Sequence, residues 1–238
     1  MPREEPDRAL PPTIDWLMII CGVICGYVDS YTLMTFDVYT SFMSGNTVSA
    51  GMHVGLARFA MAWHALLPVG PFVAGAFSGT LLQLGQSSRQ RSRVFCLIAT
   101  LLAASVMAAW AAWPDWLCIA GLSLAMGMMN TTITQVGGQS LNLGFVTGDL
   151  KSMASHLARG VAGTPVAQPV CRSDTHWRRA GTLASIWSAF LLGAVLGAAL
   201  ASRFMAWTLL VPAAALLIAA TTATPAETAC AARDHIEP

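Results

Sequence analysis

The sequence places one carboxyl group deep inside an apolar segment. Asp29 lies in the apolar stretch 14–36, about 22 Å from the start of a helix that rises 1.5 Å per residue. A carboxyl at such a depth costs about 2.5 to 3.5 kcal/mol on insertion scales, so it needs a partner or a role. Asp29 is therefore a candidate proton or cation site, or a hydrogen-bond anchor for a substrate. The structural alternative is that it pins its helix to the adjacent segment.

Two short motifs, Ser44-Gly45-Asn46-Thr47 and Thr147-Gly148-Asp149-Leu150, each combine a hydroxyl, a glycine and a polar side chain. Hydroxyl and Asx side chains cap helices, and glycine allows close backbone approach. The N–H groups at a helix N-terminus attract anions and polar groups. We expect the two turns to line a shared central cavity, and simple helix capping is the alternative. Asp149 brings a charge that Asn46 lacks, and Lys151 follows within reach of it.

The other polar residues match no pattern of catalysis or metal binding. The sequence has no phosphate loop, nucleophile elbow or H-E-x-x-H helix, and His53, His64 and His156 do not form a metal-ligand set. An intramembrane enzyme would need Asp29 paired with His53 or His156. The formal net charge of +1 provides no basic face for nucleic acid. We expect no enzyme activity, no cofactor, no metal and no nucleic-acid partner.

The composition indicates that these residues are positioned by membrane helices. The chain has 238 residues, of which 55% are hydrophobic and only 11% are charged, which is more apolar surface than a soluble core can hide. The first twelve residues lack the basic start and cleavage site of a signal peptide. We expect an all-α, multi-pass protein of a bacterial inner membrane whose main partner is the lipid bilayer. Windows of about 19 residues give six candidate spans: 14–36, 62–86, 94–113, 115–135, 181–202 and 204–223.

The segments 38–60 and 139–160 are too polar for full spans. Each contains one helix-like stretch after its polar turn, which is typical of re-entrant or broken half-helices. Six spans with a cytoplasmic N-terminus place both arginine-rich loops on the cytoplasmic side, as the positive-inside rule requires. Eight full spans remain the alternative.

Three landmarks occur in the same order in both halves of the chain. They are Gly26 to Ser30, Ser44 to Thr47 and Phe72 to Gly79, followed by Gly127 to Thr131, Thr147 to Leu150 and Phe190 to Gly197. In this repeat Asn130 takes the place of Asp29. Three crossings per half make the two copies opposite in orientation. The predicted parts are a disordered tail (1–12), a first membrane repeat (13–113), a second (114–223, with a loop at 161–179) and a C-terminal tail (224–238).

Two pairs of glycines have the spacing of helix-packing motifs. Gly75 and Gly79 lie one turn apart, as do Gly193 and Gly197, and small residues at this spacing let helices approach closely in lipid. They fit an interface between the two halves or between the subunits of a homo-oligomer. The sequence does not choose between these two.

Over nearly its whole length the chain resembles the YoaK-like bacterial membrane proteins, a family defined by a domain of unknown function. The resemblance rests on Gly26-x-x-Asp29, Ser44-Gly45-Asn46-Thr47, Gly127-x-x-Asn130 and Thr147-Gly148. It implies about six membrane helices and no assigned activity. The sequence departs from the family at Ser44, where threonine is usual, at Met129, where glutamine often stands, and at Asp149, where a neutral residue is usual.

We interpret the chain as a small secondary transporter or permease. Asp29, Asn46, Asn130 and Asp149 would surround a cavity at the membrane midplane, with Asp29 as the proton or cation site and the two helix N-termini holding a small polar solute. The alternative is a non-transporting membrane partner or assembly protein whose polar residues are structural. The substrate and the coupling ion do not follow from the sequence.

Overall fold

The computed structural model describes residues 13–84, 90–132, 135–136, 139–140, 146–167 and 174–222. Apart from turns and loops, these residues form helices and one antiparallel hairpin of two-residue strands, β1 (Gln135–Val136) and β2 (Gln139–Ser140). The all-α prediction is therefore confirmed. The predicted tails 1–12 and 224–238, and residues 168–173 of the predicted loop 161–179, lie outside the described residues. The helices are α1 (Thr13–Phe36), α2 (Met43–Gly55), α3 (Phe59–Leu66), α4 (Val69–Gln83), α5 (Gln90–Trp110), α6 (Asp115–Thr132), α7 (Val146–Val161), α8 (His176–Phe204), η1 (Met205–Leu209) and α9 (Leu210–Thr222).

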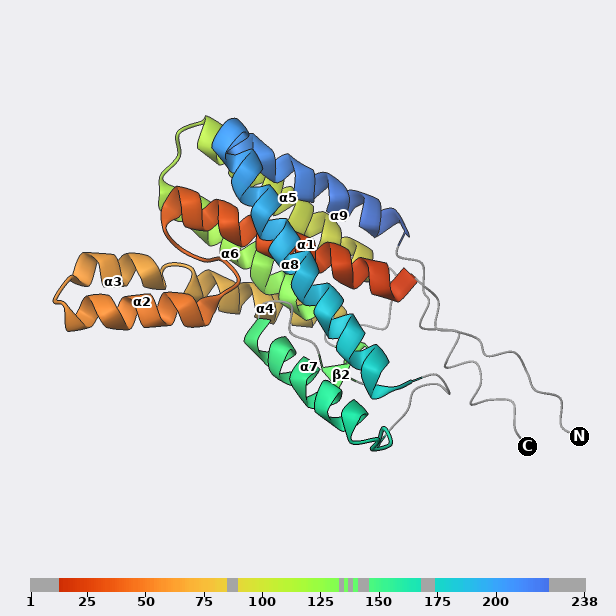
Figure 1. Cartoon of the computed structure of the whole chain (residues 1–238). Coiled ribbons are helices and arrows are strands. Elements are labelled where there is room, and N and C mark those ends of the chain that lie inside the picture. The colour runs from red at the N-terminus through yellow and green to blue at the C-terminus, as the bar shows by residue number, and fades with distance from the viewer. Residues whose placement is uncertain are drawn as a thin grey trace, which may run out of the picture.

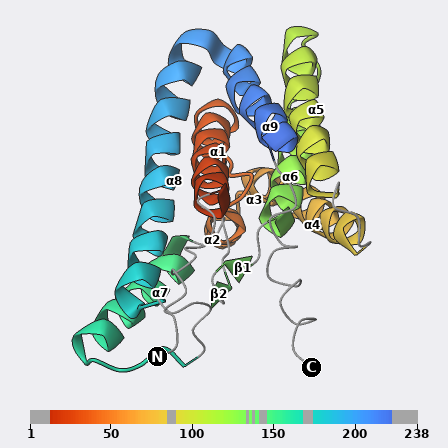
Figure 2. The ribbon, with the colours of Figure 1, turned by 90° about the vertical axis from the view of Figure 1, so that its right-hand side faces the viewer.

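Among the described residues, four segments are long and apolar enough to cross a membrane. They are Trp16–Phe36, Phe59–Gln83, Gln90–Trp110 and His176–Thr221. The last segment runs through α8 and α9. The chain reverses between these two helices at η1 (Figure 2), where Met205 has a positive φ of 49°. The segment therefore covers two of the predicted spans. The predicted span 115–135 corresponds to α6, which packs along α4 and α5 but is not among the four segments, so a crossing by α6 stays a prediction.

The two polar segments contain short helices, α2 and α7. The α2 helix pairs with α3, and the two form a hairpin that projects from the bundle (Figure 1). The chain reverses between them at Ala57, which has a φ of 55°. Beyond α3 the helix is interrupted at Pro68 before α4, as expected for a residue that lacks a backbone N–H. The α7 helix lies along the first part of α8 (Figure 2).

Glycines bring two pairs of helices into backbone contact. The α1 helix crosses α8, and α6 crosses α4. In each crossing, glycines of both helices lie so close to the partner that an added Cβ would collide with a carbonyl oxygen of the facing helix. These glycine and carbonyl pairs are Gly26 with Phe190, Gly193 with Val23, Gly127 with Phe72, and Gly75 with Leu124. The two crossings thus use glycines that occupy corresponding positions in the predicted repeat.

We expect Gly193→Ala to lower the free energy of unfolding by about 1 to 3 kcal/mol, the usual cost of overpacking a tight contact. The new methyl group would meet the backbone of Val23, which cannot rotate away. Gly181→Ala is the matched control, because Gly181 is in the same helix and has no atom within 4 Å of an added Cβ. Thermal unfolding of both variants in detergent tests the prediction, and equal melting temperatures would contradict it.

Candidate functional site

The buried carboxylate of Asp29 holds the loop that leads from α1 to α2. Its Oδ1 atom accepts hydrogen bonds from the Thr40 and Ser41 backbone N–H groups at 2.9 and 2.8 Å, and from the Thr40 hydroxyl at 3.2 Å. The Ser41 hydroxyl donates to Oδ2 at 2.5 Å. Asp29, Thr40 and Ser41 are all buried. Asp29 therefore has the partners that a buried carboxyl needs, and these partners are the structural ones that the sequence left as an alternative.

Asn46 fixes the same loop from the other side. Its Oδ1 atom accepts a hydrogen bond from the Tyr39 N–H at 3.0 Å, and its Nδ2 donates to the Tyr39 carbonyl at 2.7 Å. The Tyr39 ring packs edge-to-face on Phe42 with 5.3 Å between centroids. Gly45 makes room for this pair, because a Cβ at Gly45 would collide with the Phe42 ring. Asp29 and Asn46 together thus bind three successive residues of the loop.

The two polar motifs lie inside their helices, which corrects the expectation that they form turns before them. The α2 helix begins at Met43 and α7 at Val146, so each motif belongs to the first helical turn. Phe42 is the N-cap of α2, and no side chain caps it. Ser44, Thr147 and Gly148 are exposed. In α2 the helix begins before the motif because the Asn46 side chain does not cap the helix. It binds the backbone of Tyr39 in the preceding loop instead.

The first turns of α2 and α7 lie near each other at the middle of the molecule, as both views show (Figures 1 and 2). Asp149, in the first turn of α7, is 7% exposed. No hydrogen bond to its carboxyl is found among the described residues, in contrast to Asn46. Burial raises the pKa of Asp149 to about 6. Asp149 can therefore change its charge near neutral pH.

The remaining predicted residues are distributed over several places. Asn130 is half-buried near the end of α6 and donates to the Met126 carbonyl at 3.0 Å. His64 contacts the Phe36 carbonyl at 2.7 Å and so ties α3 to the end of α1. His156 bonds to His176 and not to Asp29, and no bond between Asp29 and His53 occurs in the described part of the chain. The acid–base pair that an intramembrane enzyme would need is thus not formed there.

Three of the partners in the structure, Thr40, Ser41 and His176, belong to no motif in the sequence. Thr40 and Ser41 are hydroxyl residues in a segment already recognised as polar, so a search for donors near Asp29 could have found them. His176 lies in the segment 161–179 that is predicted as a loop, but in the structure it is the first residue of α8. No pattern in the sequence connects it with His156, twenty residues earlier.

We expect Asp29→Ala to lower the free energy of unfolding by about 3 kcal/mol, because it leaves two buried backbone N–H groups without an acceptor. Asp29→Asn should cost much less, since an amide oxygen still accepts from the backbone and the amide N–H₂ can donate to the Ser41 hydroxyl. Thermal unfolding of both variants distinguishes the two effects. If the asparagine variant lost as much stability as the alanine variant, charge and not hydrogen bonding would be the requirement at this position.

The stability of the protein should also depend on the charge of Asp149. A carboxyl whose pKa is raised from 3.8 to about 6 by folding binds more protons in the folded state. Its contribution to stability is therefore fully present below pH 3.8 and is lost as the pH rises through 6. At pH 7.5 we expect Asp149→Asn to be more stable than the wild type by about 1 to 3 kcal/mol. The difference in melting temperature should shrink toward pH 5, and a difference independent of pH would contradict this.

Comparisons with known proteins agree with the membrane architecture. Residues 17–222 match the model of the family described as protein of unknown function DUF1275, to which the YoaK-like proteins also belong. The UPF0700 transmembrane protein RA0705 of Rhizobium meliloti (strain 1021) is 29% identical over 207 residues, which cover 85% of this chain and 82% of the relative. No solved structure matches. The chain, with its apolar helices and buried polar loop, therefore belongs to the DUF1275 family and is a multi-pass transmembrane protein.

Proposed function

We propose that the protein is a small secondary transporter or permease for a polar solute in the bacterial inner membrane, with its N-terminus in the cytoplasm. The observation that carries the proposal is the pair of matching crossings, α1 with α8 and α6 with α4. In both, a helix from the start of one half is packed by glycines against a later helix of the other half. Such packing, in which the first helix of each half lies against a helix of the other half, is expected of a transporter built from inverted repeats.

The place of the short helices supports the same proposal. In inverted-repeat transporters, the substrate site lies near the membrane midplane where half-helices begin. Here α2 and α7 both begin near the middle of the molecule, and they extend from there in different directions (Figure 1). The partial positive charge at two helix N-termini favours an anion or an electronegative group of a polar solute. We therefore place the solute between the first turns of α2 and α7.

Within this site we assign the proton-carrying role to Asp149. The sequence suggested Asp29 for this role, but the Asp29 carboxylate already accepts four hydrogen bonds from the loop. A proton bound there would compete with donors that hold the loop in place. Asp149 is buried without such donors among the described residues, and its charge can change at lower cost to the fold.

The saturated state of Asp29 also favours the second candidate, a non-transporting membrane partner or assembly protein. In that case the buried polar residues only hold the loop and α2 in position. The two candidates differ in whether a polar solute stabilises the protein and whether a proton gradient moves that solute.

The experiment starts with a thermal-shift screen of small polar solutes on the detergent-purified protein. Compounds that raise the melting temperature are then tested for uptake into vesicles that contain the protein. We expect a proton gradient to drive uptake by the wild type and Asp149→Asn to lower that uptake at least tenfold. Exchange of the solute without a gradient should persist in the variant, because a neutral side chain mimics the protonated carboxyl.

Asp115→Asn is the matched control, because Asp115 is an exposed acidic residue in the first turn of another helix, α6. It should transport like the wild type. If no solute stabilises the wild type, or if a stabilising solute is not moved across the vesicle membrane, the partner-protein candidate replaces the transporter.

A further inference from the structure

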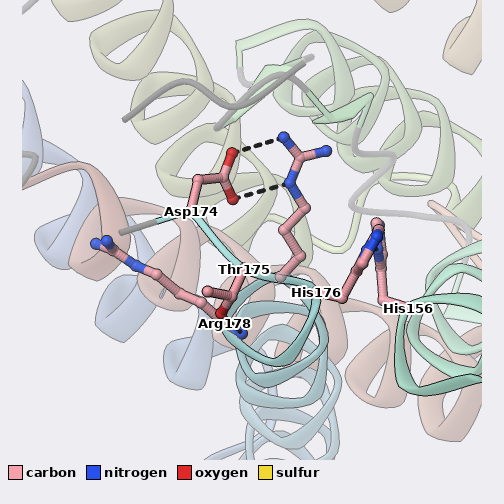
Figure 3. A network of polar contacts seen from close by, with 6 residues as sticks. His156, Asp174, Thr175, His176 and Arg178 are labelled. Atoms are coloured by element: carbon pink, nitrogen blue, oxygen red, sulfur yellow. Dashed lines mark hydrogen bonds and ion pairs between the residues drawn. The ribbon is translucent and has the colours of Figure 1, made fainter. Parts of the chain in front are cut away.

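A pair of histidines joins α7 to the beginning of α8 (Figure 3). The Nδ1 atoms of His156 and His176 lie 2.8 Å apart, and the ring centroids lie 5.1 Å apart. A hydrogen bond between two ring nitrogens needs one N–H and one lone pair. The bond therefore exists only while at least one of the two rings is neutral.

The surroundings of His176 indicate which ring donates. His176 is buried, and its Nε2 atom has no hydrogen-bond partner in the described part of the chain. A proton on Nε2 would leave a buried donor unpaired, which is costly. We assign the proton of neutral His176 to Nδ1, so that His176 donates and half-buried His156 accepts. When both rings are protonated, two changes follow. His176 gains an unpaired buried donor at Nε2, and the two Nδ1–H groups point toward each other.

The charged groups around the pair oppose extra positive charge. Burial, then the His176 ring, and then Arg179 and Arg159 lower the pKa of His156, and Asp174 acts in the opposite direction. The Asp174 carboxylate is itself bound by the Arg179 guanidinium, at 3.0 Å through Nε and 2.6 Å through Nη2. Arg178 extends away from the two rings (Figure 3). These surroundings thus disfavour a proton on the accepting nitrogen of His156.

This contact matters because α8 is the main packing partner of α7. A second contact between α7 and α8 lies nearby: the Trp177 ring of α8 is 3.0 Å from the position that a Cβ on Gly160 of α7 would take. The same α7 helix carries buried Asp149 in its first turn. Loosening α7 from α8 would therefore free the helix that carries Asp149 from its main packing partner.

We infer that the His156–His176 pair is a proton-binding latch that holds α7 on α8 while a ring is neutral and releases it when both rings are protonated. The inference does not depend on transport. Because docking holds the His156 pKa below its ordinary value of 6.5, the undocked state binds more protons. The contribution of the pair to docking is fully present above pH 6.5 and is lost as the pH falls below it.

The test follows the Trp177 ring by ¹⁹F NMR of the full chain labelled with fluorotryptophan. The protein has eight tryptophans, so the Trp177 resonance is assigned by its loss in Trp177→Phe. Between pH 8 and pH 5 we expect the wild-type resonance to shift with a midpoint below 6.5. His156→Gln, which keeps an acceptor for His176 but cannot be protonated, should abolish this titration and leave the spectrum at pH 8 unchanged.

Two further variants separate the latch from general effects of pH. His53→Gln is the matched control, because His53 stands seven residues after Asn46, as His156 stands seven after Asp149. In this variant the Trp177 resonance should shift with pH as it does in the wild type. Arg159→Gln removes one of the cations that lower the His156 pKa and should move the midpoint up, toward 6.5. A Trp177 resonance that does not titrate in the wild type, or that titrates equally in His156→Gln, overturns the inference.

Discussion

Direct backbone contact at glycines is the constraint on which this structure depends. Apolar side chains gain nothing by leaving lipid for one another, so membrane helices associate through close packing and hydrogen bonds. The α1–α8 crossing shows how one such contact determines others. Gly197 lies against the Tyr27 carbonyl, and the Tyr27 hydroxyl bonds to the hydroxyl and carbonyl of Thr208, beyond the end of α8. The position of the η1 reversal, and with it of α9, thus depends on the approach of α1 to α8.

The second constraint is the need to satisfy the backbone of a non-helical loop within a membrane protein. Within the membrane, water does not reach every backbone N–H group, so other parts of the chain must supply hydrogen-bond acceptors. Asp29 provides them for Thr40 and Ser41, and Asn46 provides both an acceptor and a donor for Tyr39. These side chains thus satisfy the backbone hydrogen bonds of the loop, as the backbone of a neighbouring strand does in a sheet. The loop in turn determines where α2 begins, and so a buried carboxyl and an amide position the first half of the candidate site.

The sequence predicted the architecture well, because hydropathy and glycine spacing are local signals. The apolar segments and the short helices α2 and α7 lie where the sequence indicated them. The start of α2 was predicted less well: polar residues were expected before the helix, but the N-cap is Phe42, a residue without capping chemistry. The partners of Asp29 and His156 could not be derived, because they depend on the path by which the chain returns. Hydrogen bonds between residues eleven to twenty positions apart leave no periodic pattern.

The two halves distribute their polar residues in opposite ways. In the first half the carboxyl is on the long helix α1, at Asp29, and the amide is on the short helix α2, at Asn46. In the second half the order of the motifs puts the amide on α6, at Asn130, and the carboxyl on α7, at Asp149. The first carboxyl is held by four hydrogen bonds, whereas the second sits on a helix whose main support is α8. Among the described residues, a proton gained or lost by the second carboxyl disturbs no such bonds. The exchange of the two side chains therefore assigns the loop-holding role to Asp29 in the first half and the proposed proton-carrying role to Asp149 in the second.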